Sequence, residues 1–280
     1  MSVLIIKSNS KVNIGLNILN LRSDGYHNIN TIFQEIDFHD TLIVEKQKSG
    51  FNFSSNVNWL SNSNDNLCFK AWEKLKSLYD FGGVSIKLEK NIPPGKGLGG
   101  GSSNAANVLK AIVKLYKLKI TKNKLEQIGS EIGADIPFFI KGGSQIGKGI
   151  GGILKPLNAH IPGRYLLVMP KLFINTSWAY EKFKKILDKP RDTINFPDFI
   201  KNGNIHFELF ENDFESIVVP AYPEIGVIKN KLLDLGATYA SLSGSGSTVF
   251  GIFDEDAVAK TAESHFLSKY KIFLSNPIES

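Results

Sequence analysis

The chain has 280 residues, of which 42% are hydrophobic and 21% are charged, the balance of an ordinary globular protein. This length allows one large domain or two smaller domains with hydrophobic cores. The single cysteine, Cys68, excludes an intramolecular disulfide bond and suits a reducing compartment. No apolar stretch is long enough for a signal-peptide core or a membrane span, so we expect a cytoplasmic protein.

The net charge of +6 at pH 7 is compatible with nucleic acid, a membrane surface or small anionic substrates. The lysines are spread along the chain, however, and no RNA-binding signature accompanies them. The charge therefore indicates only that anions are tolerated. We expect neither nucleic acid nor a membrane as a partner.

The first half of the chain begins with strands that have no helices between them, which argues against a doubly wound parallel sheet. The first good helix carries Asn64 or Asp65 as its predicted N-cap. A helix-breaking turn at 133–137 is expected to lead into a strand. The predicted strands are 3–7, 12–19, 29–38, 41–45 and 84–88, and the predicted helices are 65–78, 103–118 and 122–132.

The second half begins with a buried strand at 165–169 and ends with an amphipathic helix at 254–270. Between them we predict helices at 177–187, 207–217 and 224–235, then a glycine–serine turn that leads into an alternating strand. The sequence therefore predicts an α+β protein with an N-terminal domain over residues 1–157 and a C-terminal domain over residues 158–280.

The stretch Pro93–Asn107 reads P-P-G-K-G-L-G-G-G-S-S-N-A-A-N and precedes a helical pattern. Five of its residues are glycines within seven positions, and Ser102 or Ser103 is the expected N-cap of the helix. Glycines at a helix N-terminus direct free N–H groups and the positive end of the helix dipole toward one point. Such a point binds anions, typically phosphate. The simpler alternative is a flexible surface loop.

Two other phosphate-binding loops do not fit this chain. Gly95-x-Gly97-x-x-Gly100 has the dinucleotide spacing, but a basic turn into another helix follows where a strand ending in an acidic residue is required. Residues 142–148 approach the nucleoside-triphosphatase pattern, but Gly149 stands where a hydroxyl is needed.

The pattern P-x-G-x-G-L-G-G-G-S-S-x-A-A resembles the central motif of the GHMP small-molecule kinases, such as galactokinase, homoserine kinase and mevalonate kinase. Three further blocks carry the resemblance: Lys11–Asn17 with Arg22–Gln34, Gly133–Pro137, and Ser243–Phe250. The resemblance implies a two-lobed α+β fold, with an N-terminal lobe like ribosomal protein S5 and a C-terminal α/β sandwich. It also implies ATP and Mg²⁺ as cofactors and a monomer or homodimer.

The Asp24-Gly25-Tyr26-His27 segment resembles the branch of the family that recognises cytosine. This implies ATP-dependent phosphorylation of the 2-hydroxyl group of a cytidine-diphosphate-linked methylerythritol, in the non-mevalonate route to isoprenoid precursors. The alternatives are a homoserine or mevalonate type of GHMP kinase, a catalytically silent nucleotide-binding protein, and a nucleic-acid-binding protein.

Asp135 is the predicted catalytic base, because it lies in a helix-breaking turn with apolar neighbours and matches the position of the family's base. Lys11 lies within an apolar strand, where a charge is costly unless it is paired or functional. The resemblance implies that Lys11 partners this aspartate and stabilises charge on the transferred phosphoryl group. The alternatives are an ordinary turn aspartate and a solvent-facing lysine on an edge strand.

The substrate is expected to contact Asn13, which lies on the same strand face as Lys11. The resemblance implies that Tyr26 and His27 hold cytosine with a second aromatic residue, for which Tyr180 is preferred over Trp178, and that Thr176 makes a polar contact. Gly244 and Gly246 are expected to bring a backbone turn against the substrate diphosphate; they could equally form only a tight hairpin.

The resemblance places the nucleotide against Asn66, Lys90 and the loop Pro93, Pro94, Gly95, Lys96, Gly97, Leu98, Gly99, Gly100, Gly101, Ser102 and Ser103. Lys90 could instead be solvated, and Asn66 could simply cap its helix. Ser103 is the candidate Mg²⁺ ligand, and Lys96 either adds a charge to the phosphates or faces water. The histidines and the cysteine show no metal-binding spacing, so the other metal ligands are unknown.

Overall fold

In the computed structural model, residues 3–61, 66–159, 161–187, 194–201 and 204–279 are described. Contacts within the chain divide it into two compact units. Unit 1 comprises Met1–Ser10, His39–Pro94 and Gly99–Gly142, and unit 2 comprises Lys11–Phe38, Gly95–Leu98 and Gly143–Ser280. The chain contains helices and sheets in both units, so the predicted α+β class is confirmed.

Two long strands, β1 (Val3–Leu21) and β2 (His27–Gln47), contribute residues to both units. The sequence predicted a break in each of them, at 8–11 and at 39–40, and both breaks are wrong. Polar residues suggested the breaks, but Ser8 and Asp40 lie fully buried within continuous strands. Their hydrogen bonds to other side chains remove the cost of burying them.

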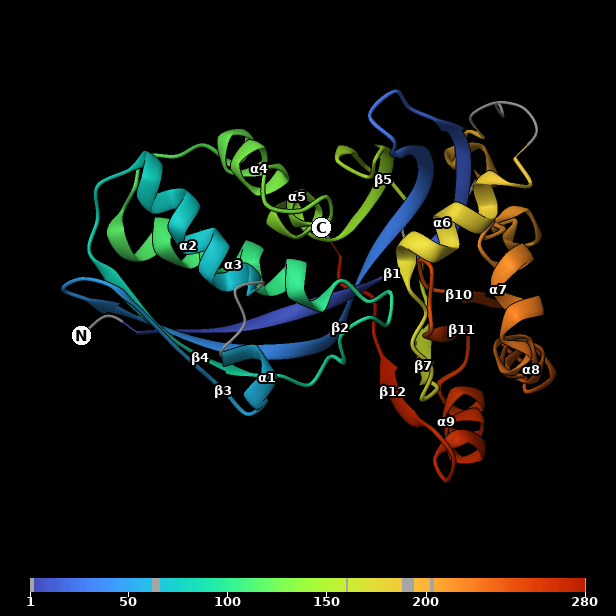
Figure 1. Cartoon of the computed structure of the whole chain (residues 1–280). Helices are drawn as coiled ribbons and strands as arrows, with labels where there is room; N and C mark the ends of the chain where they lie inside the picture. The colour runs from blue at the N-terminus through green and yellow to red at the C-terminus, as the bar shows by residue number, and fades with distance from the viewer. Residues whose placement is uncertain (1–2, 62–65, 160, 188–193, 202–203, 280) are drawn as a thin grey trace. The chain divides into compact units, whose positions relative to one another are not determined.

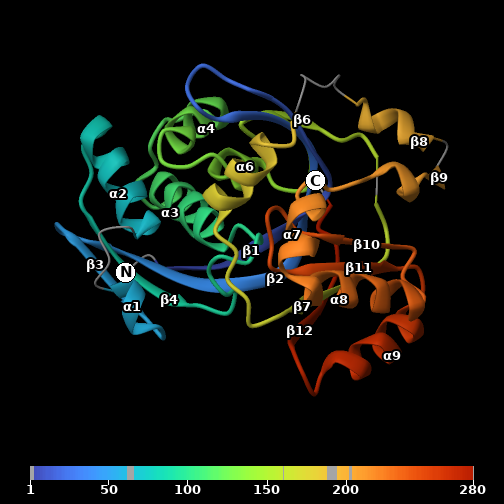
Figure 2. The ribbon, with the colours of Figure 1, turned by 45° about the vertical axis from the view of Figure 1, so that its right-hand side comes forward.

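In unit 1, the C-terminal part of β2 pairs antiparallel with β4 (Gly83–Glu89), from Thr41 opposite Glu89 to Gln47 opposite Gly83. Strand β3 (Phe51–Ser55) pairs parallel with the other edge of β4. Figures 1 and 2 show α2 and α3 on one face of these strands. The helices of unit 1 are α1 (Asn58–Ser61), α2 (Leu67–Leu78), α3 (Gly100–Tyr116), α4 (Lys122–Ser130) and α5 (Ile136–Lys141).

Helix α3 is largely buried, and Ala105, Leu109 and Ile112 have no exposed surface. It begins three residues earlier than predicted, with Gly99 rather than Ser102 or Ser103 as the N-cap. Gly99 has φ +68°, a left-handed conformation that glycine adopts without steric cost. The N-cap of α2 is Asn66, and the predicted caps Asn64 and Asp65 lie outside the described residues.

Residues after Asp135 form the short helix α5, so the strand predicted there is wrong. Pro137 lies in the first turn, where its missing N–H leaves no helical bond unmade. The next residues, Phe138 to Ile140, are buried against the neighbouring helices, since α5 packs on α3 and α4. A continuous apolar run that becomes buried is compatible with either a strand or a helix. Packing against α3 and α4 determines that it is a helix here.

In unit 2, an antiparallel sheet has the order β10-β11-β7-β12, with every residue of β7 after Arg164 buried. Helix α8 packs on β10 and β11, and α9 packs on β7 and β12. The N-terminal part of β2 pairs antiparallel with β5, which pairs with β6. The strands are β5 (Ser144–Gly149), β6 (Ile153–Pro156), β7 (Arg164–Met169), β8 (Ile200–Lys201), β9 (Asn204–Ile205), β10 (Tyr239–Leu242), β11 (Val249–Phe253) and β12 (Lys271–Ser275).

The α-helices of unit 2 are α6 (Thr176–Lys184), α7 (Glu215–Ala221), α8 (Pro223–Asp234) and α9 (Asp256–Phe266). The continuous helix predicted over 207–217 is wrong, because a 3₁₀ turn at Phe207–Leu209 is followed by non-helical residues 210–214 before α7 begins at Glu215. The N–H of Leu16 donates to the carbonyl oxygen of Glu211, and the side chain of Asn212 accepts from the N–H of Phe214. These partners replace helical hydrogen bonds.

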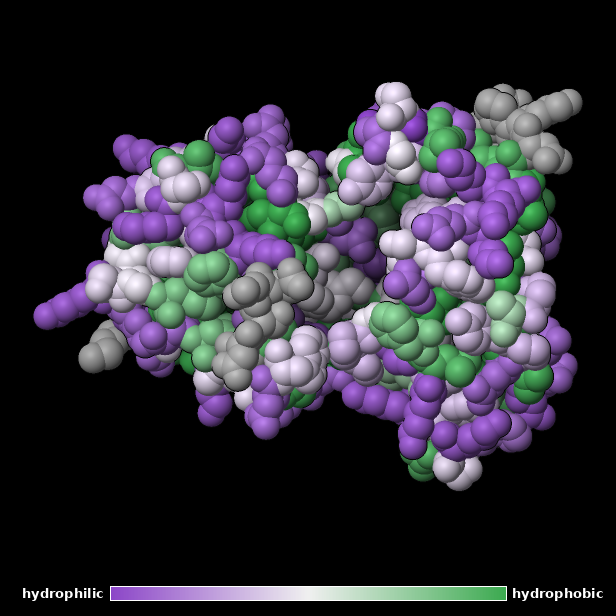
Figure 3. Space-filling model, in the orientation of Figure 1, coloured by the Kyte–Doolittle hydropathy of each residue, from purple (hydrophilic) through white to green (hydrophobic). Residues whose placement is uncertain are grey.

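Part of the scattered positive charge of the chain lies on exposed lysines of unit 1. In the view of Figure 3, hydrophilic residues cover much of the surface over α2 and α4. Lys76 of α2 and Lys122 and Lys124 of α4 are exposed. Among the described residues, no helix combines the length and the apolar character required to span a membrane.

Truncation of Leu109 to alanine in α3 is expected to destabilise the protein by about 2–5 kcal/mol, because a fully buried side chain leaves a cavity. The exposed Lys114 of the same helix is the control, and Lys114→Ala is expected to change stability by less than about 0.5 kcal/mol. Urea-induced unfolding followed by circular dichroism measures both. Equal effects of the two changes would show that α3 does not contribute to the core as described.

Candidate functional site

The N-terminus of α3 in unit 1 presents backbone donors at the end of the glycine loop. The first bond of the helix runs from the N–H of Ser103 to the carbonyl oxygen of Gly99. The N–H groups of Gly100, Gly101 and Ser102 therefore precede the helical ladder and have no acceptor within the helix. The positive end of the dipole of this 17-residue helix lies at the same place. This geometry suits an anion.

Gly100 is required where it stands. A Cβ atom built on it would lie 2.8 Å from the side chain of Ile92 and 3.0 Å from Nζ of Lys90. Gly101, the next residue, is exposed, and a Cβ there would make only ordinary contact with Leu67. The two glycines thus have different roles, since the first allows close packing and the second leaves the helix end open.

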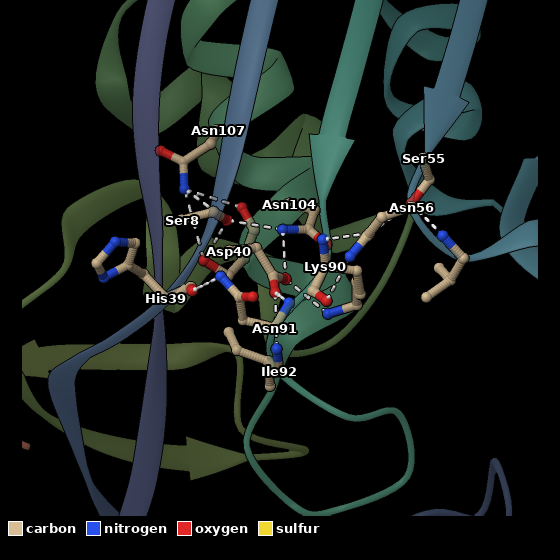
Figure 4. Close-up of polar contacts among 12 residues, drawn as sticks. Ser8, His39, Asp40, Ser55, Asn56, Lys90, Asn91, Ile92, Asn104 and Asn107 are labelled. Atoms are coloured by element: carbon tan, nitrogen blue, oxygen red, sulfur yellow. Dashed lines mark hydrogen bonds and ion pairs between the residues drawn. The ribbon is translucent and has the colours of Figure 1, made fainter. Parts of the chain in front are cut away.

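A buried carboxylate, Asp40, lies at the centre of a polar network beside this helix end (Figure 4). It accepts hydrogen bonds from the backbone N–H groups of Asn91 and Ile92 at 2.7 and 2.8 Å. It also accepts from Nζ of Lys90 at 2.6 Å and from Nδ2 of Asn104 at 3.0 Å. Four donors from two different segments thus meet one carboxylate.

Ser103, the candidate magnesium ligand, is fully buried. Its hydroxyl shares a 2.9 Å hydrogen bond with the hydroxyl of Ser8, and Nδ2 of Asn107 donates to its carbonyl oxygen at 3.0 Å. Ser102, its neighbour, is half-buried. The first turn of α3 therefore holds one serine that faces the interior and one that is accessible.

Lys90 and Asn66 both have defined structural partners. The side chain of Lys90 is 6% exposed and forms its ion pair with Asp40, so the alternative of a solvated lysine is wrong. The side chain of Asn66 accepts from the N–H of Cys68 at 2.9 Å and caps α2, as the simpler alternative proposed. Whether either residue also contacts a nucleotide remains a prediction.

Asp135 is the residue that precedes α5 in unit 1, and it is half-buried. Its side chain makes no capping hydrogen bond to α5, although it occupies the N-cap position. Its neighbours differ, since Ala134 is exposed and Ile136 is fully buried. The carboxylate is therefore accessible and is not needed to cap the helix, as a general base requires.

Lys11 in unit 2 is only 4% exposed, so the alternative of a solvent-facing lysine on an edge strand is wrong. Its Nζ donates to Oδ1 of Asn13 at 2.5 Å, and Nδ2 of Asn13 donates to the hydroxyl of Thr31 at 2.9 Å. A Cβ atom on Gly244 would lie 3.7 Å from Nζ of Lys11 and 3.5 Å from Oδ1 of Asn13. The glycine turn thus lies beside the ammonium group.

The residues Gly95–Leu98 of the glycine loop pack against the Ser243–Thr248 turn within unit 2. Gly97 has φ +72°, and a Cβ on it would lie 1.9 Å from the carbonyl oxygen of Ser243. The hydroxyl of Ser243 donates to the carbonyl oxygen of Gly97 at 2.9 Å. Two backbone segments distant in sequence are therefore in direct contact, which only a glycine permits.

Lys96, the cation inside the glycine loop, is half-buried, and the alternative that it faces water is wrong. Its Nζ donates to the carbonyl oxygens of Pro170, at 2.8 Å, and Leu172, and to the hydroxyl of Ser247 at 2.9 Å. Burial lowers the pKa of its ammonium group. The side chain ties the loop to the segment after β7.

A hollow of about 330 Å³ in unit 2 is lined by both predicted cytosine-binding segments. The rings of His27 and Tyr180 stack at 5.2 Å, and Tyr26 beside them is 63% exposed. Burial, followed by the charge of Lys184, lowers the pKa of His27. The residues that line the hollow are Leu21, Gly25, Tyr26, His27, Ile150, Ser177, Tyr180, Glu181 and Lys184.

Nε2 of His27 is buried without a hydrogen-bond partner among the described residues, which suits a polar ligand in the hollow. Trp178, the competitor of Tyr180, packs edge-on against Tyr222 at 5.7 Å and does not line the hollow. Thr176 is exposed and shares a 2.8 Å hydrogen bond with Ser245. The geometry favours Tyr180 over Trp178.

Sequence analysis missed three residues that hold these segments in place: Asp40, Asn104 and Asn212. Nδ2 of Asn212 donates to the carbonyl oxygens of Leu242 and Gly244 at 2.7 and 2.9 Å. A signal existed for Asp40, since strand alternation places it on the same buried face as Phe38 and Leu42. A carboxylate at an inward position requires partners.

No group of three or more histidine, cysteine, aspartate or glutamate residues suited to a metal ion occurs in the described part of the chain.

Comparison with protein families identifies two domains. The model of the GHMP kinases N terminal domain matches residues 66–143, and the model of the GHMP kinases C terminal domain matches residues 194–272. The first match contains the glycine loop and Asp135. The chain belongs to the GHMP kinase family, and the protein is a small-molecule kinase of the α+β GHMP kinase fold.

Curated relatives cover nearly the whole chain. The 4-diphosphocytidyl-2-C-methyl-D-erythritol kinase of Alkaliphilus oremlandii is 38% identical over 97% of this chain and 95% of its own. The enzyme of the same name from Chlorobium phaeobacteroides (strain DSM 266) is 37% identical over 99% of this chain and 96% of its own.

Solved structures agree with these relatives. A crystal structure of 4-(cytidine 5'-diphospho)-2C-methyl-D-erythritol kinase matches with a TM-score of 0.85 and 30% identity, over 99% of this chain and all of the other. Mevalonate kinase of Methanococcus jannaschii matches with a TM-score of 0.69 and 17% identity over 99% of both chains, which shows a shared fold alone.

Substitution of Gly97 by alanine is expected to weaken ADP binding by about 10-fold or more, because a displacement of about 1 Å in a binding loop has effects of this size. The new Cβ would overlap the carbonyl oxygen of Ser243, and the left-handed φ adds strain. Calorimetry measures the affinity. Gly152→Ala is the control, since nothing lies within 4 Å of its Cβ. Unchanged affinity in Gly97→Ala would contradict the contact.

Proposed function

We propose that the protein transfers the γ-phosphoryl group of ATP to the 2-hydroxyl group of 4-diphosphocytidyl-2-C-methyl-D-erythritol, a step of non-mevalonate isoprenoid precursor biosynthesis. The observation that carries the substrate is the aromatic hollow of unit 2, in which Tyr26, His27 and Tyr180 meet. A planar base fits between aromatic faces, and Nε2 of His27 is available for its polar edge. The names of two similar proteins, one curated relative and one solved structure, support the same substrate.

The substrate contacts follow from the residues around this hollow. Tyr26 and Tyr180 stack on cytosine, His27 reads its edge, and Thr176 adds a polar contact. Asn13, Gly244 and Gly246 bind the diphosphate and the polyol beside Lys11, which supplies the positive charge that a diphosphate requires.

Asp135 is the proposed base and Lys11 the proposed electrostatic catalyst. The carboxylate of Asp135 accepts the proton of the 2-hydroxyl group as its oxygen bonds to the γ-phosphorus. The bond from this phosphorus to the bridging oxygen of ADP breaks, and ADP leaves with the bonding electrons. The ammonium of Lys11 stabilises the negative charge on the transferred group.

ATP is expected to bind with its phosphates at the start of α3, where the N–H groups of Gly100, Gly101 and Ser102 have no helical acceptor. Asn66, Lys90 and Pro93–Ser103 complete the proposed nucleotide site. Mg²⁺ would be held mainly by phosphate oxygens and water, with a serine hydroxyl of the first turn of α3. Ser103 was predicted for this role, but its hydroxyl is fully buried and bonded to Ser8, so the accessible Ser102 fits better. When bound, Mg²⁺ would neutralise charge on the phosphates.

The proposal also covers the domain boundaries, the compartment, the oligomeric state and the partners. The two family domains correspond to residues 1–157 and 158–280, each of which contains one of the matched models. The protein is proposed to act in the cytoplasm. It is also proposed to act as a monomer or homodimer, without nucleic acid or a membrane as a partner.

Replacement of Asp135 by asparagine is expected to lower kcat by about 10²-fold or more, since a positioned general base contributes about this much. ADP release with ATP, Mg²⁺ and the proposed substrate measures the rate. The matched control is Asp234→Asn at the exposed end of α8, which is expected to be fully active. Turnover that survives in Asp135→Asn would remove Asp135 from its role and leave the kinase assignment intact.

Replacement of Tyr180 by leucine is expected to raise KM for the cytidine-linked substrate by about 10-fold, because stacking of an aromatic ring on a base is worth about 1–3 kcal/mol. Its matched control is Trp178→Leu on the same helix, which is expected to leave KM within about twofold.

Free cytidine diphosphate is expected to compete with the acceptor in the wild-type protein, and less well in Tyr180→Leu. The second candidate function, a homoserine or mevalonate kinase, is suggested by the fold alone and requires no base-stacking pair. Turnover of homoserine or mevalonate without competition by cytidine nucleotides would support that candidate against the proposed one.

A further inference from the structure

We infer that Asp40 is a positioning residue for nucleotide binding, which it serves by fixing the start of the glycine loop and the first turns of α3. The inference rests on the proposed function only in placing the phosphates of ATP at this helix end. Asp40 itself is fully buried, so it acts through the groups it holds.

One carboxylate oxygen fixes the entry to the loop. Oδ1 of Asp40 accepts from the backbone N–H groups of Asn91, at 2.7 Å, and Ile92, at 2.8 Å. The next two residues, Pro93 and Pro94, have no N–H group. Asn91 and Ile92 are therefore the last backbone donors before the glycines, and their bonds set the direction in which the chain enters the loop.

The second carboxylate oxygen fixes the exit from the loop. Oδ2 of Asp40 accepts from Nζ of Lys90 at 2.6 Å and from Nδ2 of Asn104 at 3.0 Å. Asn104 belongs to α3 and also donates to the hydroxyl of Ser8, which is bonded to Ser103. One buried side chain on β2 thus holds residues on both sides of the glycine loop, as Figure 4 shows.

The charge of Asp40 matters as well as its shape. The ammonium of Lys90 lies near Gly100, since a Cβ on that glycine would be 3.0 Å from Nζ. A lysine beside the positive end of a helix is unfavourable unless an anion compensates it. The carboxylate of Asp40 supplies this compensation through its 2.6 Å ion pair with the ammonium.

Asp40→Asn separates the two functions of the carboxylate. Oδ1 can still accept from the two backbone N–H groups, but the new amide directs donors at Lys90 and Asn104, which are donors themselves. We expect the Kd of ADP and KM for ATP to rise by about 10-fold, with KM for the acceptor within about twofold, because a buried donor left unpaired costs about 1–3 kcal/mol. Calorimetry and steady-state kinetics measure these values.

The exchange Asp40→Asn with Asn104→Asp provides the rescue. It restores one donor facing one acceptor between the two positions and returns a carboxylate to the neighbourhood of Lys90, while the hydroxyl of Ser8 can donate to the carboxylate that Asn104→Asp introduces. We expect ADP affinity within about threefold of wild type, since residues in one network couple strongly. A loss that persists undiminished in the double variant would overturn the inference.

Asp37→Asn is the matched control on the same strand. The carboxylate of Asp37 accepts from Ser275 and from the N–H and side chain of Asn276, far from the glycine loop in sequence. The variant Asp37→Asn is expected to alter thermal stability without altering ADP affinity. An equal loss of ADP affinity in Asp37→Asn and Asp40→Asn would show a general structural effect and would also overturn the inference.

Two further readouts keep the inference testable. If Asp40→Asn does not fold, Asn104→Ala is the second variant: it removes the bonds from α3 to Asp40 and to Ser8 and leaves the bonds of Asp40 to Lys90, Asn91 and Ile92 in place. It is expected to weaken ADP binding by about threefold; unchanged binding would overturn the inference. ADP affinity can be measured without the phosphoryl acceptor, so it tests the inference separately from the proposed function. Wild-type protein that binds ADP but does not phosphorylate the proposed alcohol would refute the proposed function. The comparison of Asp40→Asn with the wild type would still be valid. Tighter ADP binding in Asp40→Asn would show that the carboxylate only offsets charge.

Discussion

Burial of the Asp40 carboxylate is the constraint on which unit 1 depends. A carboxylate without solvent is stable only when several donors surround it, and breaking such a buried pair costs about 3–5 kcal/mol. The donors are Lys90, Asn91 and Ile92, in the segment that follows β4, and Asn104 of α3. The requirement to satisfy one charge therefore joins a strand, a loop and a helix into one rigid assembly.

Unit 2 buries a cation, Lys11, where unit 1 buries an anion. Asn13 accepts from its ammonium, and the backbone of Gly244 passes close by because no side chain intervenes. Glycine is needed at such positions for proximity as much as for flexibility. Lys96 is a second example, since its ammonium is held by carbonyl oxygens rather than by solvent. The fold thus fixes the positions of these two cations.

Sequence reasoning succeeded where a pattern is local and failed where packing decides. The helical period after the glycine loop predicted α3, but the start at Gly100 depended on a left-handed glycine that no period reveals. The turn at Asp135 was predicted from its glycine and proline, whereas the helix α5 that follows it forms because of burial against α3 and α4. Ser8 and Asp40 appeared to interrupt strands, since their partners lie about 50 to 100 residues away in sequence.

The sequence by itself determined the α+β class, the family and the residue types available for anion, base and aromatic contacts, because these depend on short motifs and on hydrophobic periodicity. Only the tertiary structure decided which polar residues are buried, which of them meet and which serine faces the interior. Such pairings join residues far apart in the chain, and their free energy arises from burial and from complementary donors and acceptors, neither of which exists before the chain has folded.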